Sequence, residues 1–92
     1  MTRSEILEKA KECVTGKREG DYGTPENNFK VIADMWNCYL HSKNKINCVI
    51  KPEDVALMMS LMKIAHITTG TAAEDSFVDA CGYLACGGEL AG

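Results

Sequence analysis

The chain has 92 residues, of which 46% are hydrophobic and 25% are charged, and its formal net charge is -3 at pH 7. This length accommodates one domain, residues 1–92, because domains shorter than about 50 residues rarely fold unaided, and the composition is too apolar for intrinsic disorder. A chain without a concentrated basic surface is not expected to bind DNA, RNA or an anionic membrane. Because so small a core leaves a thin margin of stability, we expect a homo-oligomer.

Hydropathy and cysteine usage indicate the compartment. The longest apolar run, residues 55–62, contains Ser60 and is far shorter than the roughly 20 residues that span a bilayer. Charge from Arg3 onward argues against a signal peptide. The five cysteines are an odd number without a C-x-x-C pair, which indicates free thiols in a reducing cytoplasm, with neither a disulfide framework nor a zinc site.

The first predicted helix spans about residues 3–15. Thr2 and Glu5 have the spacing of a capping box, in which each side chain satisfies a backbone N–H of the other residue. Gly16 is expected to end this helix in the left-handed conformation. Residues 16–25 contain three glycines and a proline, so they are predicted to form a structured loop.

A second helix is predicted from Pro25 to about Lys43, with Thr24 as its N-terminal cap. Its apolar residues recur at helical spacing and form one stripe: Phe29, Ile32, Ala33, Trp36 and Leu40. A polar hinge follows at residues 44–51. This helix is therefore amphipathic and is expected to pack by one face.

The third predicted helix begins at Pro52 and continues to about Ile67, and Gly70 stops it. Residues 55–67 are apolar almost all round the helix, a pattern typical of an element that neighbours enclose on every side. We therefore expect it to be the central helix of the fold.

A fourth helix is predicted over about residues 73–89, with Thr71 and Glu74 as a second capping box. Small residues within it allow close backbone approach: Ala80, Gly82, Ala85 and Gly87. No alternating pattern typical of strands is present. The fold class is therefore all-α, a compact antiparallel bundle of about four helices.

Two charged residues lie at apolar positions of the last two helices. Lys63 interrupts the apolar run of residues 58–66, and Asp79 lies within the apolar segment 77–85. Burial of an unpaired ammonium costs several kcal/mol, so each residue requires a partner. One interpretation is a structural ion pair between neighbouring helices. The other is a polar pocket in which the ammonium binds phosphate and the carboxylate accepts from a ribose or base.

Further residues suit nucleotide binding. The glycine-flanked Tyr22 and the helical Trp36 offer flat faces on which a base can stack, an interaction worth roughly 1 to 3 kcal/mol per base. Arg18 supplies a second cation for phosphate, and Asn28 and Tyr83 supply hydrogen-bonding groups. For each residue the alternative is an ordinary role in the core, a loop or a helix cap.

Several segments together resemble a small, largely uncharacterised family of bacteriophage proteins. The matching residues spread over about positions 14–90: Asp21 to Gly23, Asn27 to Phe29, Ile32 and Ala33 with Trp36, Tyr39 and Leu40, Pro52 to Met59, Leu61 to Ala65, Asp75 to Asp79, and Gly82 with Tyr83. Family members often carry Arg where this chain has His66. The resemblance implies the cytoplasm of an infected bacterial host.

More remotely, the helical layout is similar to that of the MazG-like all-α nucleoside triphosphate pyrophosphohydrolases. Such enzymes place E-x-x-E and E-x-x-D pairs on two helices, because magnesium on a triphosphate requires several converging oxygen ligands. In this chain the available acids are Asp54, Asp75 and Asp79. One turn after Asp54, where the motif requires a second acid, the residues are the apolar Leu57 and Met58. The pattern is incomplete, so catalysis with magnesium is the alternative hypothesis; otherwise no metal or cofactor is expected.

The favoured hypothesis is therefore binding without cleavage. Phages use small oligomeric proteins to sequester nucleotide-derived immune signals, such as cyclic nucleotides or ADP-ribose derivatives, and this chain is similar in scale. In this hypothesis Lys63 and Arg18 bind phosphate, and Asp79 orients Lys63 or a ribose. A third hypothesis is an inhibitor that binds a protein, in which the pair of Lys63 and Asp79 is structural only.

Overall fold

The computed structural model describes residues 1–16, 24–45, 47–70 and 73–92. Within these residues the chain forms helices α1 (Arg3–Thr15), α3 (Pro25–Ser42), α4 (Pro52–Thr69) and α5 (Ala73–Ala91), and no strand. The prediction of an all-α fold is confirmed, and each helix begins at the expected residue. Among the described residues, no helix combines the length and apolar character that crossing a bilayer requires.

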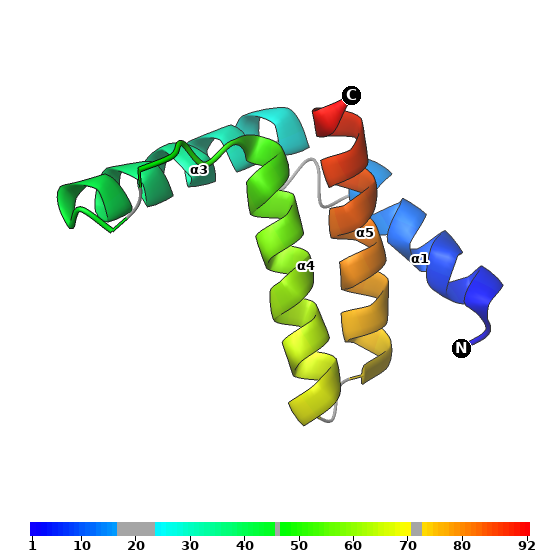
Figure 1. Cartoon of the computed structure of the whole chain (residues 1–92). Coiled ribbons are helices and arrows are strands. Elements are labelled where there is room, and N and C mark those ends of the chain that lie inside the picture. The colour runs from blue at the N-terminus through cyan, green and yellow to red at the C-terminus, as the bar shows by residue number, and fades with distance from the viewer. Residues whose placement is uncertain (17–23, 46, 71–72) are drawn as a thin grey trace.

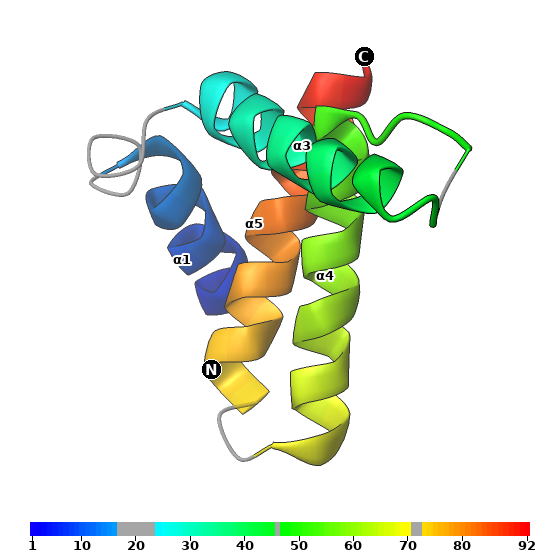
Figure 2. The ribbon, with the colours of Figure 1, turned by 90° about the vertical axis from the view of Figure 1, so that its left-hand side faces the viewer.

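Helices α4 and α5 form an antiparallel hairpin and lie side by side (Figure 1). Helix α1 packs on α5, on the side away from α4 (Figures 1 and 2). Helix α3 crosses the end of the hairpin where α4 begins and α5 ends, and part of α3 projects beyond α4 (Figure 1). The predicted compact bundle is thus confirmed, with the added feature that α3 lies across the hairpin instead of along it.

Local capping fixes where the first helix begins and ends. Thr2 Oγ1 accepts from the Glu5 backbone N–H and the Thr2 N–H donates to Glu5 Oε1, each over 3.1 Å, so the predicted capping box is confirmed. Gly16 does end α1, but with φ -110°, so the predicted left-handed conformation is wrong. Glycine is required there for another reason: a Cβ would lie 2.7 Å from the Glu12 carbonyl oxygen.

The cap and the loop of α3 also have specific partners. Thr24 Oγ1 accepts from the Asn27 N–H over 3.3 Å, as the sequence predicts. The Asn37 side chain accepts from the Ile50 N–H over 2.7 Å and donates to the Ile50 carbonyl over 2.8 Å. This pair of bonds anchors the hinge between α3 and α4 to the side of α3. The second predicted capping box, at Thr71 and Glu74, lies outside the described residues.

The hydrophobic core lies where α3 crosses the hairpin. Its buried members come from three helices: Phe29, Ala33, Val55, Ala56 and Cys86. Half-buried side chains pack around them: Val14, Ile32, Trp36, Ile50, Met59, Tyr83 and Leu90. The core is small, because Val55 is the largest side chain that is fully buried among the described residues.

Small residues allow α5 to approach its neighbours closely, as expected. A Cβ at Gly87 would lie 3.0 Å from the Ala56 Cβ on α4, and one at Gly82 would lie 3.3 Å from Val14 Cγ1 on α1. Helix α5 therefore packs between α4 and α1, although Phe77 and Leu84 on it are 47% and 50% exposed. The expectation that the third predicted helix is enclosed on every side is wrong for a single chain, since Leu61 of α4 is 64% exposed.

Candidate functional site

The two charged residues in apolar segments meet between α4 and α5. Lys63 Nζ lies 3.0 Å from Asp79 Oδ2, and the two side chains are 19% and 27% exposed. The antiparallel packing of the hairpin brings the C-terminal half of α4 opposite the first half of α5, which explains the juxtaposition. The pair is neither dry nor fully solvated, so its ammonium and carboxylate remain accessible to a small molecule.

A cavity of about 420 Å³, partly open to solvent, lies beside this ion pair. It is formed by the C-terminal half of α4 and the first turns of α5. The lining residues are Lys63, His66, Thr69, Gly70, Asp75, Ser76 and Asp79. We call it the hairpin pocket. Its volume lies within the range of roughly 300 to 1,000 Å³ that is typical of small-molecule sites.

The lining of the hairpin pocket is polar and carries both signs of charge. Lys63 supplies an ammonium with three donors, and Asp75 and Asp79 supply carboxylates that accept hydrogen bonds. His66 adds an imidazole, and Thr69 adds a hydroxyl that donates to the Ala65 carbonyl over 2.8 Å. Such a set can hold an anionic group and several ligand hydroxyls together.

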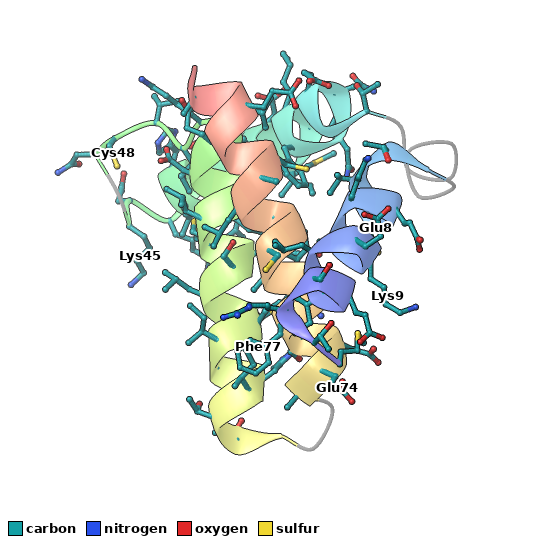
Figure 3. The ribbon with its side chains drawn as sticks, turned by 90° about the vertical axis from the view of Figure 1, so that its right-hand side faces the viewer. Glu8, Lys9, Lys45, Cys48, Glu74 and Phe77 are labelled. Carbon is teal, nitrogen blue, oxygen red and sulfur yellow. The ribbon has the colours of Figure 1, made fainter. Side chains whose placement is uncertain are left out.

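The hairpin pocket is held by the end of α4 and the start of α5. The Gly70 N–H donates to the His66 carbonyl over 2.7 Å, and a Cβ at residue 70 would lie 2.7 Å from that oxygen. Glu74 at the start of α5 pairs with the amino group of Met1, which ties the N-terminus to this end of the hairpin (Figure 3). This hydrogen bond from the amino group to Glu74 raises the pKa of the amino group.

The structure does not bring the predicted aromatic and amide residues to the hairpin pocket. Trp36 and Tyr83 pack against the core, and the Tyr83 ring lies 6.2 Å from the ring of Phe29 at an interplanar angle of 41°. Asn28 is half-buried in the first turn of α3, which crosses the other end of the hairpin. The stacking and hydrogen-bonding roles expected of these residues therefore do not belong to this pocket.

Two other predicted site residues, Arg18 and Tyr22, lie outside the described residues. Their expected roles in phosphate binding and stacking stay predictions from the sequence.

The carboxylates of the magnesium alternative are not brought together within the chain. Asp75 and Asp79 both line the hairpin pocket, but Asp54 lies in the first turn of α4, at the opposite end of the hairpin. There Asp54 Oδ2 accepts from the Lys51 backbone N–H over 2.9 Å, so it caps the helix. The described parts of the chain contain no group of three or more His, Cys, Asp or Glu residues arranged to hold a metal ion.

The sequence interpretation did not include His66, Thr69 or Ser76 in the site. A signal for two of them is present in the spacing: His66 is three residues after Lys63, and Ser76 is three residues before Asp79. Residues at this spacing share one face of a helix. The contribution of Thr69 depends on the end of the hairpin, which spacing along a helix does not reveal.

Residues 5–91 match the family described as Domain of unknown function (DUF6378). The chain is 41% identical over 81 residues to the Gene 55 protein of Mycobacterium phage D29, and 40% identical over 78 residues to the Gene 55 protein of Mycobacterium phage L5. These alignments cover 88% and 85% of this chain and 50% and 47% of those proteins. The chain thus spans about half the length of these curated relatives. No solved structure matches it.

The chain therefore belongs to the DUF6378 family and is a relative of mycobacteriophage proteins. The expected membership of a small family of phage proteins is confirmed.

Proposed function

Starting from this family membership, we propose that the protein binds a small nucleotide-derived molecule in the hairpin pocket and holds it without cleaving it. The observation that carries the proposal is the partly buried pair of Lys63 and Asp79, 3.0 Å apart, beside a cavity of about 420 Å³. A pair that served stability alone would not require an open polar cavity next to it.

Lys63 is the residue that binds phosphate in this proposal. Its ammonium carries three donors, of which the contact with Asp79 uses one, so the others can reach an anion in the cavity. Hydrogen bonds between an ammonium and a phosphate are charge-assisted and about twice as strong as neutral ones. His66 on the same helix face adds a donor beside the phosphate.

The carboxylates and hydroxyls of the hairpin pocket suit the sugar. Asp75 and Asp79 accept hydrogen bonds, so they are matched to ribose hydroxyls. Ser76 can donate or accept, and Thr69, whose hydroxyl donates to the Ala65 carbonyl, can accept. Two carboxylates and one ammonium also disfavour a ligand with many negative charges, since each further phosphate is repelled. A ligand with one or two phosphates and free ribose hydroxyls fits this balance better than a triphosphate.

The separation of the acids supports retention over cleavage. The magnesium-dependent pyrophosphohydrolase alternative requires Asp54, Asp75 and Asp79 to converge, and Asp54 instead caps α4 at the far end of the hairpin. In a phage protein, retention of an intact nucleotide would remove a signal of the cyclic nucleotide or ADP-ribose class. We propose this sequestration in the cytoplasm of the infected host, as a counter to its immune signalling.

A ligand panel tests the proposal. The protein is mixed with mononucleotides, cyclic dinucleotides and ADP-ribose derivatives, and its melting temperature is measured with each. A ligand at about 100 times its Kd stabilises the protein by about 2.7 kcal/mol, which for a domain of this size raises the melting temperature by more than 10 °C.

Chromatography of the same mixtures with magnesium then shows the fate of the ligand. Recovery of the intact ligand after heat denaturation supports sequestration, whereas release of a cleaved product supports the pyrophosphohydrolase alternative. A melting temperature that no member of the panel changes contradicts nucleotide binding and favours the third hypothesis, an inhibitor that binds a protein.

A further inference from the structure

One side of α4 carries a row of large apolar side chains that no other described part of the chain covers. The row comprises Leu57, Met58, Leu61, Met62 and Ile64, which are between 39% and 64% exposed. At 3.6 residues per turn these positions fall within an arc of about 160°. The opposite side of the helix, with Ala56, Ser60 and Lys63, is buried or half-buried against α5. We call the exposed row the α4 apolar face.

The accessible area of the whole chain is larger than expected for a folded monomer of its mass. The chain exposes 6362 Å², whereas the scaling of area with mass gives about 5,200 Å² for a folded monomer of 10.0 kDa. The excess of roughly 1,100 Å² exceeds the 800 Å² that each partner buries in an interface of standard size. The radius of gyration, 14.2 Å, is also larger than the value of about 12.3 Å expected for 92 residues.

From these observations we infer that the α4 apolar face is the interface between two copies of this chain, related by a two-fold axis. A two-fold interface brings the same patch of both copies together, so the patch must be complementary to itself. The α4 apolar face meets this condition, because none of its five residues is charged, and neither is Ala65, which lies among them on the helix surface. Two such faces can therefore meet without bringing like charges together.

Pairing of this face accounts for the apolar character of α4 all round the helix. One side is buried by α5 within the chain, and the other side is buried by the partner copy. The inference is independent of ligand binding, since Lys63 lies on the side of α4 that faces α5.

Sedimentation equilibrium on the whole chain tests the inference. Over a protein concentration from about 1 to 200 μM we expect a mass near twice the chain mass of 10.0 kDa. Leu61→Glu places a charge in the centre of the α4 apolar face and is expected to weaken dimerisation by at least 100-fold. The matched control is Leu7→Glu on α1, because Leu7 is 63% exposed and Leu61 is 64% exposed.

Each outcome of the sedimentation experiment either supports or overturns the inferred dimer. A dimer that Leu61→Glu dissociates and Leu7→Glu preserves, with unchanged circular dichroism, supports it. A wild-type chain that is monomeric throughout the concentration range overturns it and leaves a foreign protein as the candidate occupant of this face. A dimer that both variants preserve, or that Leu7→Glu alone dissociates, places the interface elsewhere and also overturns it.

A second measurement covers the case in which Leu61→Glu does not fold. In a sample of mixed labelled and unlabelled wild-type copies, isotope-filtered nuclear Overhauser spectra report contacts between copies only. Contacts between methyl groups of Leu57, Met58, Leu61, Met62 or Ile64 and the other copy are expected. Intermolecular contacts that involve none of these methyl groups, or no intermolecular contacts, contradict the inference.

Discussion

Replacement of Lys63 by Met and of Asp79 by Asn, singly and together, separates the contribution of this ion pair to stability from its proposed role in binding. At the 3.0 Å distance between Lys63 Nζ and Asp79 Oδ2, the Coulomb attraction is about 1.4 kcal/mol in water and about 5.5 kcal/mol at an effective dielectric constant of 20. Desolvation and lost side-chain entropy offset most of this attraction, because the two side chains are 19% and 27% exposed. We therefore expect a coupling free energy of about 1 kcal/mol in the absence of ligand.

The assay is urea unfolding of the four chains of this double-mutant cycle, followed by circular dichroism. Lys30 and Asp34 provide a matched control, because their pair spans 3.1 Å within α3 and both side chains are more than 60% exposed. Their coupling is expected to be about 0.3 to 0.5 kcal/mol, as for other pairs four residues apart on a helix. A coupling above about 3 kcal/mol for Lys63 and Asp79 would place the pair among buried structural ion pairs and refute the reasoning that it is retained for a ligand.

Three further outcomes follow from the packing and the caps. Asn37→Leu leaves a backbone N–H and a carbonyl of the hinge without their partner, and we expect a loss of about 1 to 3 kcal/mol in urea unfolding; an unchanged midpoint would contradict the anchoring role. Gly87→Val overpacks the contact between α4 and α5 and should lower the free energy of unfolding by about 1 to 3 kcal/mol. In the control Gly88→Val, no atom lies within 4 Å of the added Cβ, so the free energy of unfolding should change by less than about 0.5 kcal/mol. Equal losses in the two variants would refute the close contact at residue 87. The hydrogen bond that the Thr2 backbone N–H donates to Glu5 holds the pKa of Glu5 below its usual range, so the stability it contributes is present above about pH 4.3 and is lost as the pH falls through the lowered pKa. Unfolding between pH 6 and 3 should therefore depend less on pH in Glu5→Gln, and identical pH profiles would contradict this.

The starts of the helices could be predicted from the sequence because they depend on local chemistry. Thr2 with Glu5 and Thr24 cap helices through hydrogen bonds to residues three positions away, and Pro25 and Pro52 fit the first turn. These effects require no knowledge of the rest of the fold. The conformation of Gly16 was not predictable in the same way, because several C-terminal geometries satisfy the same carbonyl groups.

The direction of α3 was not predictable from its own pattern. A stripe of apolar residues shows which side of a helix is buried and leaves open the angle at which it packs. The Asn37 side chain, which anchors the hinge to α3, depends on contacts with Ile50, 13 residues away. The surroundings of Trp36 and Tyr83 were also not predictable from the sequence, because a flat aromatic ring can stack on a base or pack in a hydrophobic core. In the structure both residues are partly buried and pack against the core where α3 crosses the hairpin.

Part of the candidate site was predictable. Lys63 and Asp79 could be identified because each is a charged residue within an apolar segment and therefore requires a partner. In the antiparallel hairpin the two residues are partners of each other. The cavity beside them was not predictable, because it depends on how the end of α4 packs against the start of α5.

The most direct test of ligand binding compares two lysine variants by isothermal titration calorimetry. The titrant is the nucleotide from the panel that raises the melting temperature most, and the proteins are the wild type, Lys63→Ala and Lys30→Ala. Both lysines pair with a carboxylate, but only Lys63 lines the hairpin pocket. We expect Lys63→Ala to raise the Kd at least 10-fold, equivalent to about 1.4 kcal/mol, and Lys30→Ala to leave it unchanged. An unchanged Kd in a folded Lys63→Ala variant would contradict the central claim.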